Sequence, residues 1–183
     1  NPFSKESLES MYSKVEEAMP VSQLVSKTNP FQNFKPKEKI ILIAPGETIL
    51  AHTVEFIGGK NGIGDFQAVT TEMRARSSVG RIGIAVCKCA GWGDIGYINR
   101  WTMEITNFSN SIIPLPVGMR IAQIIFHEVK PVGLQDDYSK VGKYQSDKDV
   151  KTLKKNWKPS DMLPKLYNDK DLGKFSSFYN DSE

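Results

Sequence analysis

The sequence predicts a mainly β fold, either a β-sandwich or a jelly-roll-like barrel. Between residues 40 and 130 short apolar runs alternate with turn-forming residues, which is the pattern of such folds. The 14 glycines and 10 prolines among 183 residues fit a chain rich in turns. No helix of useful length fits this region, apart from a short one after Arg76.

The expected strands are runs of apolar and β-branched residues, separated by turn-forming pairs such as Pro45-Gly46, Asn61-Gly62 and Val117-Gly118. The runs are 40–43, 48–51, 54–57, 82–86, 101–105 and 121–126. The sequence contains no internal repeat, and its length fits one domain with a tail.

An amphipathic helix is expected ahead of this region, over residues 4–19. Apolar side chains recur there at helical spacing from Leu8 to Met19. Ser4 is a suitable N-cap, and Pro20 ends the run.

A polar linker with two prolines follows over residues 28–39, and residues 146–183 form a polar extension with only short helical stretches. We therefore expect three parts: an N-terminal helix and linker over 1–39, a β-domain over 40–133, and a C-terminal lid and extension over 134–183.

Composition and charge exclude several classes of function. The net charge is only +3, and residues 40–130 contain no basic stripe with interleaved aromatic residues, so we expect no nucleic-acid partner. The basic stretch from Lys140 to Lys174 is broken up by aspartates and is expected to be a solvated tail. No apolar run approaches the roughly 18 residues of a membrane span, and the first residues do not form a secretion signal. We expect a cytoplasmic protein with no membrane association.

The two cysteines, Cys87 and Cys89, are expected to be buried or half-buried thiols. At i and i+2 of a strand they would share a face, too far apart for an unstrained disulfide, which suits a reducing compartment. Together with His52 and His127 they form no pattern of zinc ligands.

A first cluster of polar side chains lies between Arg74 and Arg81 and contains three arginines and two serines. Arginine and serine donate to phosphate oxygens, and Ser77-Ser78 is placed to open a short helical turn that directs N–H groups at an anion. The alternative is an exposed basic turn.

A second cluster is the glycine-rich hairpin from Ala90 to Tyr97. Its glycines would let the backbone approach a ligand, Tyr97 could stack on a ring, and Asp94 could accept from a sugar hydroxyl. The alternative is an ordinary hairpin.

Glu104 stands in the otherwise apolar run 101–105. A carboxylate in such surroundings is suited to act as a general acid or base. The alternatives are that Glu104 faces solvent or pairs with an arginine. A fourth segment, from Tyr138 to Gln145, carries two tyrosines and two lysines that could fold over a phosphorylated ligand, unless it is a plain surface loop.

Three motifs resemble the dCTP deaminase branch of the trimeric dUTPase superfamily. Residues 45–55 are similar to its PGE-x-x-LA-x-T-x-E segment, residues 76–83 to RSS-x-x-R-x-G, and residues 118–126 to GM-R-I-x-Q-x-x-F. The segment from Ala90 to Asn107 selects the branch, because the residue ten positions after Asp94 is Glu104, as in the deaminases, where dUTPases have an apolar residue. The resemblance covers roughly residues 40–145 and implies a dUTPase-like distorted jelly-roll barrel.

This resemblance implies three catalytic residues. Glu104 would be the general base that deprotonates the water attacking C4 of cytosine, while Arg81 and Ser77 would position the water and the developing charge. Further substrate contacts are implied for other residues: Arg76 and Ser78 at the phosphates, Asp94 at the 3′-hydroxyl, the main chain of Ala90, Thr102 and Met103 at the base, Tyr138, Lys143 and Gln145 in a lid, and Trp92, Tyr97 and Gln123 elsewhere in the site.

The resemblance further implies a homotrimer with sites shared between subunits, no zinc, and Mg²⁺ carried by the triphosphate. The zinc deaminases need H-x-E and P-C-x-x-C, which His52-Thr53-Val54-Glu55 and Cys87-Lys88-Cys89 do not match. The leading prediction is a hydrolase that converts dCTP to dUTP and ammonia, with dUTP and dTTP as further ligands.

Two alternatives remain on the same fold. The first is a bifunctional enzyme that yields dUMP and pyrophosphate, because Ala90-Gly91-Trp92 followed by Asp94 resembles the TAGW-I-D hallmark of that form. The second is a nucleotide-binding regulator without activity. Departures from the family pattern, such as Asp147 where a glutamine is usual, lie in the lid.

Overall fold

The computed structural model describes residues 4–6, 18–24, 33–62, 67–145, 149–169 and 171–172. The chain divides into two compact units, one of residues 17–157 and the other of residues 1–16 with 158–183. The described part of the second unit holds two 3-10 turns, η1 (Pro159–Met162) and η2 (Leu166–Asn168). The unit of residues 17–157 holds every strand of the described residues and carries the site.

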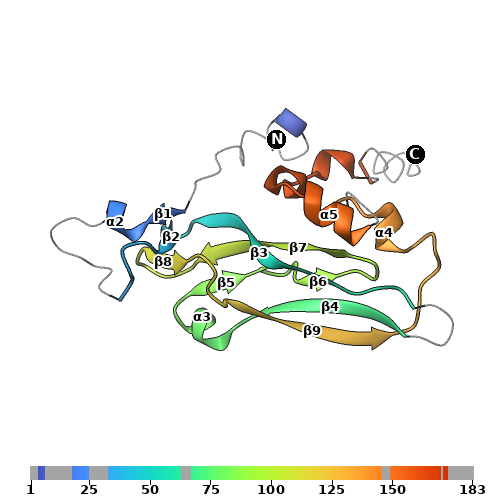
Figure 1. Ribbon diagram of the computed structural model, residues 1–183, viewed down its shortest axis with the longest axis horizontal. Helices are drawn as coiled ribbons and strands as arrows, with labels where there is room; N and C mark the ends of the chain where they lie inside the picture. The colour runs from blue at the N-terminus through green and yellow to red at the C-terminus, as the bar shows by residue number, and fades with distance from the viewer. Residues whose placement is uncertain are drawn as a thin grey trace, which may run out of the picture. The chain divides into compact units, whose positions relative to one another are not determined.

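Three small antiparallel sheets make up this unit (Figure 1). Strands β1 (Met19–Pro20), β2 (Lys39–Ile43) and β8 (Ile113–Pro116) form the first. Strands β3 (Thr48–Gly58), β7 (Ile98–Asn107) and β5 (Ile84–Val86) form the second. Strands β6 (Trp92–Gly93), β4 (Ala68–Ala75) and β9 (Ala122–Val129) form the third. The predicted mainly β architecture is therefore confirmed.

Four short helices accompany the strands in this unit. They are α2 (Val21–Leu24), α3 (Ser77–Arg81), α4 (Tyr138–Val141) and α5 (Val150–Asn156). The short helix expected after Arg76 is α3, and the described residues of the extension hold only short helices, as predicted. No helix among the described residues is long and apolar enough to cross a bilayer.

The core lies between the sheets and determines which way β7 presents its side chains. Trp101, Met103 and Ile105 are almost fully buried in one cluster with residues of β2, β4, β5 and β8. Because side chains alternate along a strand, the residues between them, Thr102 and Glu104, lie on the opposite face. We call this the outer face of the β3–β7–β5 sheet.

The structure corrects several predicted strand boundaries. The runs 48–51 and 54–57 belong to one strand, β3, whose pairing with β7 is irregular between His52 and Phe56. The run 82–86 begins as a strand only at Ile84, because α3 ends at Arg81 and Gly83 adopts a positive φ of 91° in the turn that follows.

The predicted N-terminal helix falls largely outside the described residues. Of residues 4–19, only 4–6 and 18–19 are described, and Met19 lies in β1, paired with Ile40 of β2. Met19 is therefore a strand residue, contrary to prediction, and most of the predicted helix lies outside the described residues.

The two cysteines do not share a face, contrary to prediction. Cys87 is buried, whereas Cys89 is exposed. The reason is a turn, since Cys87 (φ 63°) and Lys88 (φ 41°) both adopt left-handed backbone conformations just after β5. Neither thiol forms a disulfide.

Candidate active site

Glu104 is held on the outer face of β7 by the pairing on both sides of the strand. It lies opposite Leu50 of β3, and its carbonyl oxygen accepts the backbone N–H of Cys87 at 3.1 Å. Its side chain is half-buried and forms no ion pair within the described residues. The alternative that Glu104 is paired with an arginine is therefore not what the structure shows.

The neighbouring thiol remains protonated at neutral pH. Burial, and secondly the negative charge of Glu104, raise the pKa of Cys87 to about 12. The Cys87 thiol near the Glu104 carboxylate is thus an uncharged group.

The outer face carries a row of polar groups along β7, namely Arg100, Thr102, Glu104 and Thr106. Thr106 donates to or accepts from the Thr48 hydroxyl at 2.8 Å. Thr102, by contrast, has a buried hydroxyl without a hydrogen-bond partner. The main chain of Thr102 and Met103, predicted to read a base, therefore lies directly beside Glu104.

The arginine–serine cluster forms the turn of α3, which buries Val79 as its anchor. Ser77, Ser78 and Arg81 remain exposed around that anchor. Arg76 donates from Nη1 to the carbonyl oxygen of Arg120 at 2.7 Å, which ties the start of α3 to the segment before β9. The turn thus offers hydroxyl and guanidinium donors to solvent.

The described residues show no hydrogen bond or ion pair between α3 and Glu104. Instead α3 leads into β5, whose Ile84 pairs with Asn107 at the far end of β7. Among the described residues the structure therefore shows no bond that joins Ser77 or Arg81 to the predicted base.

The glycine-rich hairpin packs across β4 and β7. The Thr70 hydroxyl donates to the carbonyl oxygen of Gly93 at 2.6 Å, and a Cβ at Gly93 would clash with the indole of Trp101. Gly96 adopts a φ of 92° and leaves no room for a side chain beside Asp137. Asp94, between these glycines, is exposed.

Tyr97 points inward rather than out to solvent. Its ring makes edge contacts with Trp101 at 5.7 Å and with Tyr138 at 5.4 Å between centroids. Burial, followed by the charge of neighbouring groups that include Tyr138, raises its pKa.

The predicted lid lies against this hairpin. The backbone N–H of Tyr138 donates to the carbonyl oxygen of Ile95 at 2.9 Å, and Ile98 donates to the side-chain oxygen of Gln145 at 3.3 Å. Asn99, which sequence reasoning did not assign to the site, donates from its buried amide to the carbonyl oxygen of Tyr144. Lys143 lies half-buried in the same segment. The structure thus brings the lid residues together with Asp94 and Tyr97.

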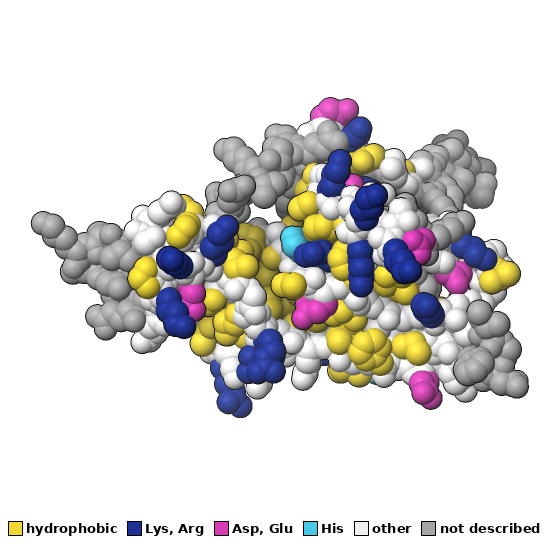
Figure 2. All heavy atoms as spheres, in the orientation of Figure 1, with side chains coloured by type: hydrophobic (Ala, Val, Ile, Leu, Met, Phe, Trp, Pro, Cys, Tyr) yellow, Lys and Arg dark blue, Asp and Glu magenta, His cyan; other side chains and the backbone are white. Residues whose placement is uncertain are grey.

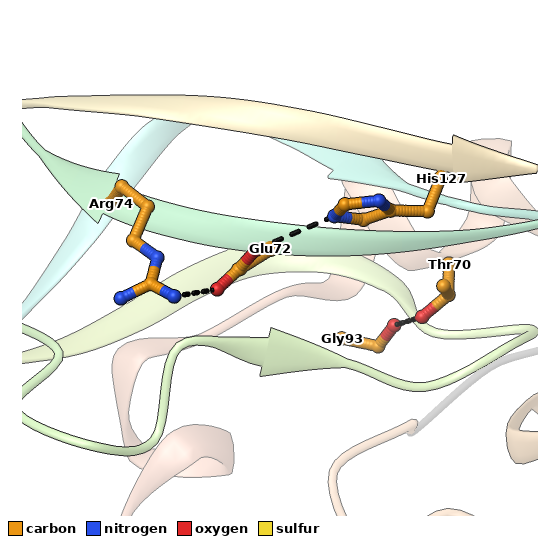
Figure 3. A network of polar contacts seen from close by, with 5 residues as sticks. All are labelled: Thr70, Glu72, Arg74, Gly93 and His127. Atoms are coloured by element: carbon orange, nitrogen blue, oxygen red, sulfur yellow. Dashed lines mark hydrogen bonds and ion pairs between the residues drawn. The ribbon is translucent and has the colours of Figure 1, made fainter.

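Trp92 and Gln123 belong to another face, on the β6–β4–β9 sheet. Figure 3 shows Glu72 of β4 between Arg74, with which it forms an ion pair, and His127, whose Nε2 is 3.4 Å away. The His127 ring stacks with Trp92 at 5.8 Å. Gln123 lies opposite Arg74 on the neighbouring strand.

No three His, Cys, Asp or Glu side chains are grouped as metal ligands in the described ranges.

Sequence reasoning also missed a cluster of rings on the outer face. The Arg100 guanidinium lies 5.1 Å from the ring of Phe56 and 5.0 Å from that of Trp157, which follows α5. No local signal could have indicated this contact, because its members are far apart in the sequence.

Comparison with known proteins places the chain in a family. A model of the dCTP deaminase-like family matches residues 7–129, which is more than half of the chain. The chain therefore belongs to the dCTP deaminase-like family, as the motifs predicted.

Several relatives carry the name "dCTP deaminase, dUMP-forming". The protein of Leptospira biflexa is 35% identical over 128 residues, covering 69% of this chain and 66% of its own length. That of Methanopyrus kandleri is 34% identical over 113 residues, covering 61% and 55%. The chain thus spans 66% or less of the length of these relatives. A dUTPase of EIAV is a structural neighbour with 22% identity and a TM-score of 0.40, over 52% of this chain and 77% of its own.

Proposed function

We propose that this chain hydrolytically deaminates dCTP in deoxyribonucleotide metabolism, with no zinc in the reaction. The observation that carries the proposal is Glu104, a half-buried carboxylate without an ion pair among the described residues, on the outer face of β7. Family membership and the named relatives support it. The cytoplasmic location expected from the sequence stays a prediction.

In this proposal Glu104 carries one proton through the reaction. Its carboxylate takes a proton from water as the oxygen bonds to C4 of cytosine. The C4–N4 bond then breaks, and Glu104 returns the proton to the departing amino group, which leaves as ammonia. One water is consumed, and the base becomes uracil.

Ser77 and Arg81 would orient the water and stabilise the charge that develops. Because they form no bond with Glu104 among the described residues of one chain, the proposal includes a homotrimer in which α3 of one subunit meets β7 of the next. Sites shared in this way would be made by the symmetry of the assembly.

Whether the chain releases dUTP, or dUMP and pyrophosphate, is a separate question from the deamination itself. The relatives named dUMP-forming, together with Ala90-Gly91-Trp92, favour the bifunctional alternative over release of dUTP. A second water would then attack the α-phosphorus, and pyrophosphate would leave. Mg²⁺ would arrive with the triphosphate and shield its charge, since this ion keeps to phosphate oxygens and waters.

Product analysis tests the proposal. The chain is incubated with dCTP, dCMP or dUTP and Mg²⁺, and ammonia, dUTP, dUMP and pyrophosphate are quantified. We expect ammonia, dUMP and pyrophosphate in equal amounts from dCTP. Ammonia with dUTP alone would establish the monofunctional form. Tight binding of dCTP without turnover would contradict the proposed activity and indicate the regulator.

A further inference from the structure

Three buried polar atoms without hydrogen-bond partners lie together on the outer face of the β3–β7–β5 sheet. They are Thr102 Oγ1, Arg100 Nε and Trp157 Nε1. Among the described residues only Thr71 has a comparable unpartnered atom, and it lies on β4. Buried donors normally have acceptors, and leaving one unpaired is unfavourable. Their concentration on this face, where Thr102 is the neighbour of Glu104 along β7, therefore calls for an explanation.

Trp157 covers this part of the face. Its ring lies 4.6 Å from that of His52 and 5.0 Å from the guanidinium of Arg100. His52 of β3 lies opposite Thr102 of β7. Arg100 is two residues before Thr102 on β7 and therefore lies on the same face. Thr102 is therefore next to the two residues that Trp157 contacts, and its hydroxyl is buried.

The covering segment lies outside the part of the chain that the family model matches, residues 7–129. Leu153 of α5 is buried, while Lys151, Lys154 and Lys155 of the same helix are exposed. Figure 2 shows Lys and Arg side chains gathered over this region. Such a surface attracts an anionic ligand, as a nucleotide would be.

Thr102 is placed to meet the base that Glu104 would act on. The two residues are two positions apart on one strand face, a separation of about 7 Å, which a pyrimidine ring with its substituents can span. A hydroxyl can donate to the carbonyl oxygen or ring nitrogen of such a base. Among the described residues that hydroxyl has no hydrogen-bond partner.

We propose that the Thr102 hydroxyl is a contact to an acceptor atom of the pyrimidine base, and that Trp157 is a cover which moves off it when the nucleotide binds. This inference rests on the proposed function and deepens it, because it assigns a specificity-determining side chain and a gate to the same site. The cation–π contacts that hold Trp157 over Arg100 are of a strength that ligand binding can replace.

Three threonine-to-valine variants test the contact, since valine keeps the shape and removes the hydroxyl. Thr102→Val is expected to leave Tm unchanged or raise it, because an unpartnered hydroxyl is lost, and to raise the KM for dCTP about tenfold. Thr71→Val removes the buried and unpartnered hydroxyl that lies on β4. Its Tm is therefore also expected to stay unchanged or rise, while its KM for dCTP is unchanged. Thr106→Val breaks the bond to Thr48, so Tm falls and KM is unchanged.

The binding of dCTP, measured as a ligand-induced rise in Tm, is recorded for each variant beside turnover. An unchanged KM and ligand-induced shift in Thr102→Val, or a fall in Tm like that of Thr106→Val, would overturn the proposed contact while wild-type turnover still upheld the proposed function. A wild-type chain that neither binds nor deaminates dCTP would overturn both.

Two variants of Trp157 test the cover. Trp157→Ala is expected to lower Tm but to tighten dCTP binding several-fold, because the nucleotide no longer has to displace the ring. Trp157→Phe keeps a ring over Arg100 and should behave like the wild type, except that it lacks the change in tryptophan fluorescence on binding. Asn156→Ala, at an exposed and uncharged position of α5, is the control and should change neither Tm nor dCTP binding. Weaker dCTP binding by Trp157→Ala would overturn the cover.

Discussion

Two thiols at the end of β5 differ in reactivity because one turn separates them. Cys87 is 1% exposed, and its pKa is raised to about 12, whereas Cys89 is exposed. Only a thiolate is an effective nucleophile. Since the chain has no other cysteines, its thiol chemistry reports directly on the surroundings of Glu104.

A thiol reagent at pH 8 should therefore modify Cys89 alone in the folded protein and both cysteines after denaturation. Counting labelled thiols by mass spectrometry measures this. Cys89→Ser should lose the fast reaction entirely, and an equally fast reaction of Cys87 would contradict the burial described for it.

Individual site residues were predictable to different degrees. The position of Glu104 opposite the core side chains follows from strand alternation between Trp101 and Ile105. The environment of Tyr97 did not follow, because its contact with Tyr138 joins distant parts of the chain. The different environments of the two cysteines depend on the positive φ angles of Cys87 and Lys88. Neither residue type favours such an angle, so the sequence did not indicate the turn.

At the scale of elements, Asp137 fastens the lid segment. Its carboxylate accepts from the Ser139 N–H at 2.9 Å and from the Ser139 hydroxyl at 2.6 Å, and so caps α4. Burial alone would raise the pKa of Asp137, but these hydrogen bonds outweigh it and hold the pKa below its ordinary value. The ionised carboxylate is therefore the form that stabilises the folded lid.

The sign of the pH dependence follows from this lowered pKa. The stabilisation is fully present above the unfolded value of 3.8 and is lost as the pH falls through the lower folded value. The protection factors of the amides of residues 137–145, which are exchange rates corrected for the intrinsic effect of pH, should therefore fall over that acid range.

Removal of the cap should have the same effect at neutral pH. Asp137→Ala should weaken protection of the lid amides by about 1 kcal/mol, whereas Asp136→Ala, at an exposed neighbour, should not. Equal protection in the two variants would contradict the role of Asp137.

Strands with clear apolar patterns were predictable, whereas β1, β4, β6 and β8 were not, and β4 and β8 show why. β4 carries Thr70, Thr71 and Glu72 among its apolar residues, so its pattern did not indicate a strand, although both threonines are buried. β8 holds Pro114 and Pro116, which argue against a strand except at an edge, and β8 is the edge of its sheet.

At the scale of the whole molecule, the proposed catalytic groups lie in separate places of one chain. Glu104 is on the outer face of β7, while Ser77 and Arg81 are on α3, beyond β5. The proposed function therefore includes an assembly in which α3 of one subunit meets β7 of the next, as the motif resemblance also implied.

Mixing inactive variants tests shared sites. Arg81→Ala and Glu104→Gln should each be inactive alone, and their mixture, unfolded and refolded together, should regain part of the ammonia release from dCTP. Recovery arises because some sites then combine an intact α3 with an intact β7. A mixture as inactive as its components would contradict sites shared between subunits.

The central claim is that Glu104 is the base that activates water. The most direct measurement compares ammonia release from dCTP by the wild type and by Glu104→Gln, with nucleotide binding followed by the shift in Tm. The change keeps the shape of the side chain and removes its ability to accept a proton. We predict that turnover falls by at least about a hundredfold, as for loss of a general base, while dCTP binding is retained. Undiminished ammonia release by Glu104→Gln would contradict the account.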